Sequence, residues 1–460
     1  MGRLRRAAAL ATLGLLALAP AAQSAEDSAS VRIESGLVAG VVSDGVARYK
    51  GIPYAAPPVG ERRWRAPAPP TAWSGVRTFD DYGSSCPQAG PPRRVPAGSR
   101  AESTSEDCLT LNIWTPVERA TRLPVMVWLH GGGNVNGTGS QTFYDGSAFA
   151  RDGVVLVTLN YRLGILGFFA HPALGGKQGD CRTGNFGLLD QIAALRWVQR
   201  NIAAFGGDPS NVTLFGESAG AEDALILASS DAAKGLFGKV ISESAGGLWA
   251  RWPTLAQAQT QGAKVATALG SPGAGATAAQ LRSLPIDRLA AVSDDDQIGP
   301  MLDGCVVQAP PAVALAHGAR VPLIIGTNRD EDVAYFTAPA RWVAARTATA
   351  GTRAYLYRFD YVWSLLASRR PSATHGSEIP FVFDYYDADL FDDTDRKIAA
   401  ALHGCWIAFA QTGTPACPGV AAWPAYDPHD RRVMVFDAHP SVRAPADSDA
   451  QDLLEPPMSP

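Results

Sequence analysis

Short apolar runs that alternate with helical patterns constrain the fold of this chain more than any other feature. The runs Val125–Leu129, Val154–Leu159, Val212–Phe215 and Val321–Ile325 have the length and continuity of buried strands. Gly187–Ala203 places apolar residues at three- and four-residue spacings, which predicts an amphipathic helix. Strands that alternate with helices favour a mainly parallel sheet covered on both faces. In such sheets the reactive groups gather beyond the carboxyl ends of the strands.

The composition is that of a large globular protein. The chain has 460 residues, of which 46% are hydrophobic and 18% charged, and it shows no internal repeat or long low-complexity linker. These features predict one continuous α/β domain over residues 25–460. The formal net charge of −4 disfavours a nucleic-acid partner, because nucleic-acid binding surfaces are strongly basic.

The first residues have the order of a secretory signal peptide. Three arginines within residues 1–6 precede the apolar stretch Ala7–Ala19, and a small-residue cleavage site follows at Ala22-Gln23-Ser24 or ends at Ala25. A short membrane anchor is the alternative, but the stretch is too short to span a bilayer comfortably. We therefore expect residues 1–24 to be removed, no membrane-spanning helix after them, and a secreted or periplasmic protein.

A G-x-S-x-G motif at residues 216–220 follows the predicted strand Val212–Phe215 and precedes a helix-compatible run, Ala221–Ser229. In this setting, small residues two before and two after the serine allow a sharp turn that lifts the serine hydroxyl clear of the sheet edge. A chance Gly- and Ser-rich turn is the alternative. The flanking strand and helix favour a nucleophile at Ser218.

Three glycines at residues 131–133 follow His130 at the end of Val125–Leu129. Successive glycines allow backbone N–H groups to turn inward toward a developing oxyanion. The partner donor would be the N–H of Ala219, directly after the nucleophile. A flexible turn explains the glycines alone equally well, whereas a phosphate-binding loop is disfavoured because no Gly-Lys-Ser/Thr closes the run.

The acid and base of such a site are expected after the serine, in the order serine, acid, histidine. Val321–Ile325 is followed by Asp330 and Glu331, and the next predicted strand, Tyr355–Phe359, is followed by a loop that reaches His375. Pattern alone favours Glu331 with His375 only modestly and leaves Asp330 open as the acid.

Six cysteines in an exported chain permit disulfides, with fifteen possible full pairings. No C-x-x-C pair is present, and no H-x-x-x-H motif accompanies the cysteines, so a zinc site is disfavoured. Neither a metal ion nor an organic cofactor is implied.

Several longer motifs resemble the type-B carboxylesterase family, which includes cholinesterases and bacterial para-nitrobenzyl esterases. The stretch FGGDPSNVTLFGESAG at 205–220 is similar to its nucleophile signature, and EDCLTLNIW at 106–114 is similar to its second signature. Further similar stretches lie at residues 48–55, 160–164, 184–188 and 409–413. The resemblance covers nearly all of the mature chain and implies an α/β-hydrolase fold.

Carried over motif by motif, the resemblance implies roles for individual residues. It makes Ser218 the nucleophile, Glu331 the acid and His375 the base. It also implies an oxyanion hole, the set of N–H donors that stabilises the negative oxygen of the reacting ester. Its donors would be the backbone N–H groups of Gly132, Gly133 and Ala219.

The same resemblance implies a disulfide between Cys86 and Cys108. A Cys405–Cys417 disulfide is a second expectation, and no partner is assigned to Cys181 or Cys305.

The chain departs from the family pattern at three single positions. Asp332 follows the acid where the family usually has glycine. Asp223 stands where the family often has serine, and Asn134 replaces the usual aromatic residue after the glycine run.

A larger departure is the short distance of 44 residues between Glu331 and His375. It predicts a shortened helical cap, because a segment that normally covers the active-site gorge is missing after about Phe336. The loop between Cys86 and Cys108 also has no Trp, Tyr or Phe. Choline specificity is therefore disfavoured, because cholinesterases have an aromatic choline site there.

The sequence thus predicts a secreted serine hydrolase that cleaves small-molecule carboxylic esters through an acyl-enzyme intermediate. One alternative is a catalytically weak or inactive esterase-like binding protein, which the filled triad positions disfavour. Another is a hydrolase of amide, carbamate or thioester bonds. No oligomeric state is implied.

Overall fold

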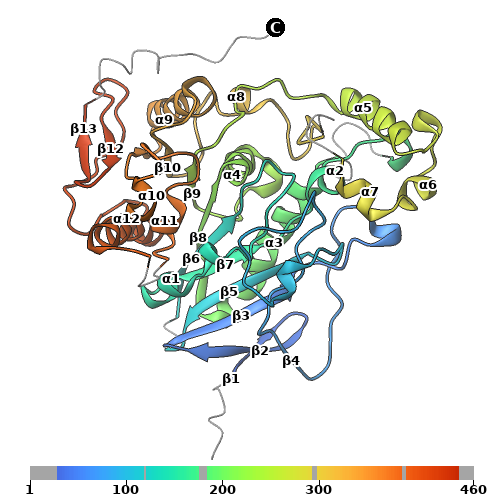
Figure 1. Ribbon diagram of the computed structural model, residues 1–460, viewed down its shortest axis with the longest axis horizontal. Coiled ribbons are helices and arrows are strands. Elements are labelled where there is room, and N and C mark those ends of the chain that lie inside the picture. The colour runs from blue at the N-terminus through green and yellow to red at the C-terminus, as the bar shows by residue number, and fades with distance from the viewer. Residues whose placement is uncertain (1–27, 119–120, 176–183, 293–297, 386–389, 445–460) are drawn as a thin grey trace, which may run out of the picture.

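The computed structural model describes residues 28–118, 121–175, 184–292, 298–385 and 390–444 (Figure 1). The predicted signal peptide, residues 1–24, lies outside the described residues. Within the described ranges, no helix combines the length and the apolar character needed to cross a membrane.

One large sheet runs through the molecule (Figure 1). Its strands follow the order β1-β2-β3-β5-β7-β6-β8-β9-β10-β11-β12-β13, and β4 pairs with β2. The strands are β1 (Ser28–Ile33), β2 (Gly36–Ser43), β3 (Val46–Pro53), β4 (Val76–Thr78), β5 (Thr110–Pro116), β6 (Leu123–Leu129), β7 (Val155–Leu159), β8 (Gly207–Glu217), β9 (Lys239–Glu243), β10 (Leu323–Asn328), β11 (Ala354–Phe359), β12 (Val433–Phe436) and β13 (Ser441–Arg443).

The middle of the sheet is parallel and its two edges are antiparallel. All neighbours from β7 through β6, β8, β9, β10 and β11 to β12 pair in parallel. The first strands, β1, β2, β3 and β5, pair antiparallel, as β12 and β13 do at the other edge. The predicted, mainly parallel sheet is confirmed. The antiparallel N-terminal edge was not predicted from the apolar runs.

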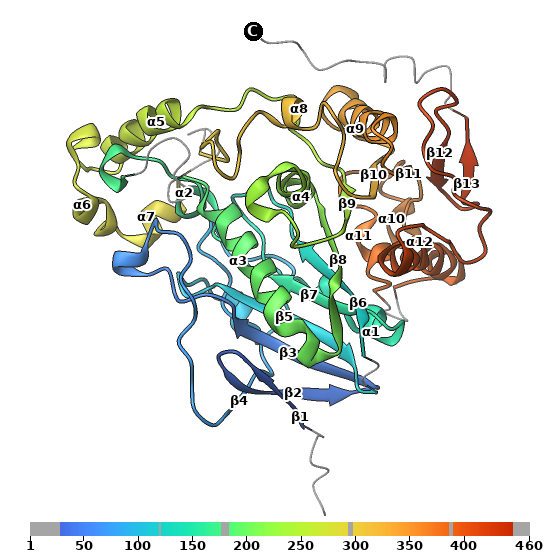
Figure 2. The ribbon, with the colours of Figure 1, turned by 180° about the vertical axis from the view of Figure 1, so that it is seen from behind.

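Helices cover both faces of this sheet (Figures 1 and 2). The helices are α1 (Ser147–Arg151), α2 (Gly164–Gly167), α3 (Phe186–Asn201), α4 (Ala219–Ser229), α5 (Leu255–Ala268), α6 (Ala278–Arg282), α7 (Ile286–Ala290), α8 (Pro311–Ala314), α9 (Ala338–Thr349), α10 (Ser364–Ala367), α11 (Ile379–Val382) and α12 (Asp393–Thr412). Figures 1 and 2 show α5, α6 and α7 at one end of the molecule and α12, β12 and β13 at the opposite end.

Strand β6 shows why its apolar run is continuous. Val125, Val127 and Leu129 belong to a core shared with α3, α4 and α9. Met126 and Trp128 point to the other face, where the core includes residues of α1 and α12. Because successive side chains of a strand point to opposite faces, a strand buried on both faces needs apolar residues at every position.

The predicted elements match the observed ones closely. The helix expected over Gly187–Ala203 is α3, and the strand expected over Val321–Ile325 is β10, which extends to Asn328. The strand expected over Val212–Phe215 is longer, because β8 begins at Gly207 and ends at Glu217. Since β6, β8 and β10 run in one direction, the residues that follow them meet at one edge of the sheet.

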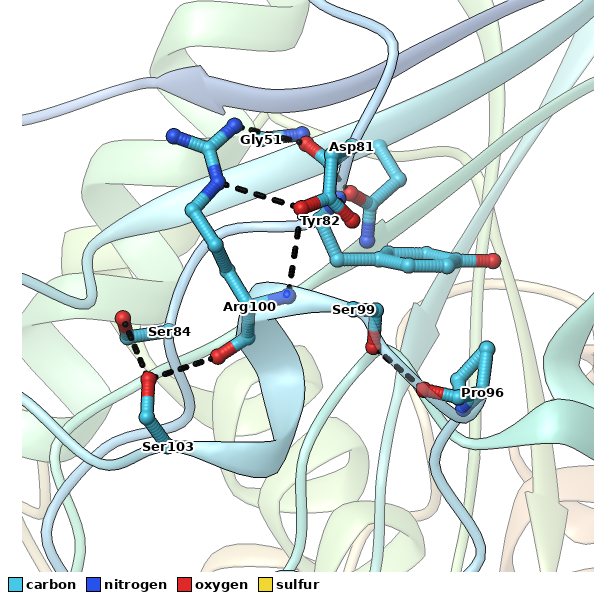
Figure 3. Close-up of polar contacts among 9 residues, drawn as sticks. Gly51, Asp81, Tyr82, Ser84, Pro96, Ser99, Arg100 and Ser103 are labelled. Atoms are coloured by element: carbon cyan, nitrogen blue, oxygen red, sulfur yellow. Dashed lines mark hydrogen bonds and ion pairs between the residues drawn. The ribbon is translucent and has the colours of Figure 1, made fainter.

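The loop closed by Cys86 and Cys108 is held to the segment before it. The disulfide joins these two cysteines, as expected. Figure 3 shows Asp81 accepting hydrogen bonds from the Arg100 backbone N–H at 3.1 Å and from Arg100 Nε at 3.3 Å. Ser84 and Ser103 hydroxyls lie 3.3 Å apart beside this pair. A second disulfide joins Cys405 to Cys417, and Cys305 is also disulfide-bonded.

Candidate active site

The turn between β8 and α4 has the geometry of a nucleophile elbow. Ser218 has φ 56° and ψ −125°, a backbone conformation that side chains rarely adopt. A Cβ atom on Gly216 would lie 2.6 Å from the Leu129 carbonyl oxygen, and one on Gly220 would lie 2.1 Å from it. These two positions therefore require glycine, as the motif predicts. The Ser218 N–H donates to the carbonyl of Glu243 on β9 at 2.9 Å, which anchors the turn.

Glu331 and His375 are brought together beyond the ends of β10 and β11. Glu331 Oε1 lies 2.5 Å from His375 Nδ1, and Glu331 Oε2 accepts the Asn328 N–H at 2.8 Å. The Glu331 side chain is only 1% exposed. A buried carboxylate held at both oxygens can fix the tautomer and orientation of the imidazole ring.

The neighbouring carboxylates are placed differently. Asp330 is exposed, and its backbone N–H donates to the carbonyl of Ala373 at 2.9 Å. Asp332 Oδ1 accepts the Tyr335 N–H at 2.7 Å and so caps the one-turn π-helix Val333–Thr337. Glu331, not Asp330, is therefore the carboxylate hydrogen-bonded to His375, and Asp332 has a capping contact instead.

Three backbone N–H groups gather where the ends of β6 and β8 meet. Gly132 and Gly133 have φ values of 110° and 64°, so the loop after β6 turns back on itself. Within the described residues, the N–H groups of Gly132, Gly133 and Ala219 donate to no protein acceptor. A Cβ atom on Gly131 would lie 2.9 Å from Ser218 Cβ, so this loop packs directly on Ser218. Such N–H groups can bind an oxyanion.

His130 supports the same loop from behind. Its ring stacks on Tyr161 with centroids 4.4 Å apart, and the Tyr161 hydroxyl donates to the His130 carbonyl at 2.6 Å. Burial lowers the pKa of His130 to about 4, so the ring is neutral at ordinary pH.

The second ring nitrogen of His375 contacts a carboxylate that the sequence did not single out. His375 Nε2 lies 3.1 Å from Glu217 Oε1, and the Ser218 hydroxyl makes no hydrogen bond to any described residue. Burial lowers the pKa of His375, but the hydrogen bond to Glu331 and the charges of Glu217 and Glu331 together raise it to about 9. In this structure Nε2 of His375 is therefore paired with Glu217 and not with the Ser218 hydroxyl.

Glu217 belongs to a buried group of carboxylates beneath the histidine, with Glu243 and Glu378. Burial raises the pKa of all three, and the charge of at least one nearby glutamate adds to each rise. Asn328 Nδ2 donates to Glu378 Oε2 at 2.7 Å, and Trp406 Nε1 donates to Glu243 Oε1 at 2.7 Å. The position of Glu217 beside the nucleophile in the motif was the one sequence signal that pointed to it.

A cavity of about 200 Å³ lies beside the loop that follows β6. Its lining includes the apolar residues Pro87, Val135, Leu163, Ile165, Leu166 and Leu289 and the polar residues Gln88 and Asn136. On another side of the site, the Phe336 ring packs against His375 with centroids 4.9 Å apart. Within the described residues, no group of three or more His, Cys, Asp or Glu side chains is arranged to hold a metal ion.

Comparisons with known proteins agree with this geometry. The carboxylesterase family model matches residues 27–336 and 332–453, and the two matches meet where a missing segment was predicted. A fumonisin B1 esterase of Sphingopyxis macrogoltabida is 37% identical, over 90% of this chain and 88% of its own. The para-nitrobenzyl esterase of Bacillus subtilis is 34% identical, over 93% and 98%.

A solved para-nitrobenzyl esterase structure superimposes with a TM-score of 0.82 at 33% identity, covering 92% of this chain and 99% of that one. The shared architecture is the α/β-hydrolase fold that the motifs predicted. With the family model matched along nearly the whole domain and relatives above 30% identity, this chain belongs to the carboxylesterase family of ester hydrolases.

Proposed function

We propose that this protein is a serine carboxylesterase that works through an acyl-enzyme intermediate. The observation that carries the proposal is the convergence of three features at one sheet edge. These are the elbow at Ser218, the buried Glu331 bonded to His375, and three backbone N–H groups that donate to no acceptor among the described residues. This constellation fits attack on a carbonyl carbon, because it supplies a nucleophile, a base with an orienting acid, and donors for an oxyanion.

In the proposed reaction, Ser218 Oγ attacks the ester carbonyl carbon as His375 Nε2 takes its proton. The carbonyl oxygen becomes an oxyanion held by the N–H groups of Gly132, Gly133 and Ala219. His375 then protonates the leaving alcohol, and the acyl-enzyme remains on Ser218. A water molecule, deprotonated by His375, attacks this ester, and His375 returns the proton to Ser218 Oγ as the Ser218–acyl bond breaks and the acid leaves. Glu331 keeps Nδ1 protonated and stabilises the imidazolium in both halves.

Glu217 has a distinct role in this proposal. Its carboxylate holds Nε2 of the protonated ring at 3.1 Å in the free enzyme. A substrate that occupies the oxyanion hole would bring the ring toward Ser218. Glu217 would then stabilise the imidazolium that forms during attack, because a nearby negative charge favours the protonated ring.

The cavity beside the loop that follows β6 supports small esters with an apolar arm. Its volume of about 200 Å³ accommodates a short acyl or alcohol group, and most of its lining residues are apolar. The His375 side chain is 39% exposed, which supports an open site over the shortened cap. Fumonisin B1 and para-nitrobenzyl esters, which appear in the names of relatives, belong in the first substrate panel.

Export is the second part of the proposal. The N-terminal pattern and the disulfides Cys86–Cys108 and Cys405–Cys417 support a secreted or periplasmic enzyme. Amino-terminal sequencing of the protein from the medium or periplasm should begin near residue 25. A cytoplasmic protein that retains residues 1–24 would contradict this part.

The catalytic assignment is tested with p-nitrophenyl acetate and butyrate. Ser218→Ala should reduce kcat to background, and a fluorophosphonate should label Ser218 in the wild-type chain. Ser229→Ala serves as the matched control, because Ser229 lies at the end of the same helix and its hydroxyl donates to the Ile226 carbonyl. Full activity in Ser218→Ala, or labelling at another serine, would overturn the proposal.

A further inference from the structure

Two of the positions at which this chain departs from its family are hydrogen-bonded to each other. Asn134 Nδ2 donates to Asp223 Oδ1 at 3.1 Å, although the two residues are 89 positions apart. Gln191 Nε2 donates to the other oxygen, Asp223 Oδ2, at 2.5 Å. All three side chains are buried, with exposed fractions of 2% for Asn134 and 0% for Asp223 and Gln191.

This trio joins the two segments from which the oxyanion donors come. Asn134 directly follows Gly133, adopts the left-handed conformation with φ 61°, and accepts the Gly164 N–H at its carbonyl at 2.7 Å. Asp223 lies on α4, whose first residue is Ala219. Gln191 lies on α3, which runs beside α4 (Figures 1 and 2). The Asn134–Asp223 bond therefore spans from the glycine loop to the nucleophile helix.

The polar chemistry of the trio is poorly suited to a role in stability alone. The carboxylate accepts one amide donor at each oxygen, yet Asn134 Oδ1 and Gln191 Oε1 are buried without a partner among the described residues. A buried unsatisfied acceptor costs about 1–3 kcal/mol, and apolar residues of similar shape avoid that cost. The hydrogen bonds to Asp223 fix the orientation of the Asn134 and Gln191 side chains, which apolar packing would define less closely.

We propose that Asp223 is a positioning residue of the oxyanion hole, acting through Asn134. In this role it sets the Gly132 and Gly133 N–H groups at the correct distance from the Ala219 N–H. The inference rests on the proposed function, because it assigns the oxyanion donors named there. Its physical basis is that the donors must meet one oxygen atom from two separate segments, and displacements near 1 Å reduce rates about a hundredfold.

The test compares Asn134→Gly, Asp223→Asn and their double variant with the wild-type chain. Glycine tolerates the left-handed backbone at 134, so this change removes the amide with little strain. Asparagine at 223 keeps the size of the side chain. Its NH2 group would face the NH2 group of either Asn134 or Gln191, so one of the two hydrogen bonds is lost. Each single variant should lower kcat by about ten- to a hundredfold with little change in KM. Because both changes break the same Asn134–Asp223 hydrogen bond, kcat of the double variant should fall no further than kcat of the more impaired single variant.

A second measurement separates positioning from general destabilisation. An aryl trifluoromethyl ketone forms a hemiketal oxyanion with a reactive serine, so its affinity should fall by the same factor as kcat. Asn201→Ala removes another buried amide of α3, at the end away from the site, and should leave kcat and ketone affinity unchanged. If one variant does not fold, the other still provides both readouts.

The inference is overturned if both single variants keep kcat and ketone affinity within threefold of wild type. It is also overturned if the losses of kcat in the two single variants multiply in the double variant, or if KM alone changes. Failure of the proposed function would look different, because it would appear in the wild-type chain as activity independent of Ser218. An inactive wild-type chain that binds no ketone would overturn both.

Discussion

Glu217→Gln is expected to shift the pH dependence of ester hydrolysis toward lower pH. Attack requires the neutral His375 ring, so kcat/KM rises with pH through the pKa of this histidine. Burial lowers that pKa, but the Glu331 hydrogen bond and the charges of Glu217 and Glu331 raise it to about 9. Removing the Glu217 charge takes away one of the effects that raise the pKa. His375 should therefore lose its proton, and activity should appear, at lower pH.

The size of the shift follows from the contact. Opposite unit charges at 3.1 Å attract by about 5 kcal/mol at an effective dielectric constant of about 20. This is an upper value, because the histidine side chain is 39% exposed and burial raises the pKa of Glu217, so that its carboxyl carries less than a full charge. A reduced value of about 1.4–2.7 kcal/mol corresponds to a shift of roughly one to two pH units.

The measurement is a kcat/KM profile for p-nitrophenyl acetate, followed at the isosbestic wavelength of p-nitrophenol. Glu34→Gln is the matched control, because it removes a glutamate that pairs with Arg200 on the surface. The control should leave the midpoint of the profile in place. An unchanged or higher midpoint in Glu217→Gln would refute the reasoning, and a lower plateau without a shift would assign Glu217 to another step.

Three further predictions concern the acid, the disulfide and the pocket. Glu331→Gln should lower kcat on the order of 10³–10⁴-fold, because an amide can hold the wrong tautomer of His375. Asp330→Asn and Asp332→Asn should keep kcat within about tenfold of the wild-type value. A large loss of kcat in Asp330→Asn would instead make Asp330 the acid. Replacing Cys86 and Cys108 together with serine should lower the free energy of unfolding by roughly 3 kcal/mol, measured by urea titration, since the bridge closes a separation of 22 residues. An unchanged urea midpoint would contradict that estimate. For an open site, kcat/KM should change only slightly among p-nitrophenyl esters of increasing acyl length. A change in kcat/KM of about tenfold per one or two methylenes would indicate a closed pocket.

The sequence by itself determined the central sheet and the location of its reactive edge. Runs such as Val125–Leu129 must be buried on both faces, and the spacing of glycines around Ser218 permits one kind of turn. These are local constraints, in which the pattern of neighbouring residues fixes the backbone. The Cys86–Cys108 pairing and the choice of Gly132 and Gly133 came from motif resemblance. The structure contains that disulfide and gives the Gly132 and Gly133 N–H groups no acceptor among the described residues.

Only the tertiary structure decided which side chains meet across long separations. Asp330, Glu331 and Asp332 are consecutive carboxylates. The residue pattern favours Glu331 only modestly, and the family resemblance points to it without showing the contact. Packing of the 373–375 segment turns Glu331 inward to His375 and leaves Asp330 exposed.

The same is true of the polar contacts around the nucleophile. Glu217 is adjacent to Ser218 in the chain, yet its contact with His375 depends on two strand ends meeting. Asn134 and Asp223 each depart from the family pattern when taken singly, and the fold shows them as one hydrogen-bonded pair. A local sequence pattern specifies strands and turns, whereas such contacts depend on where distant segments pack.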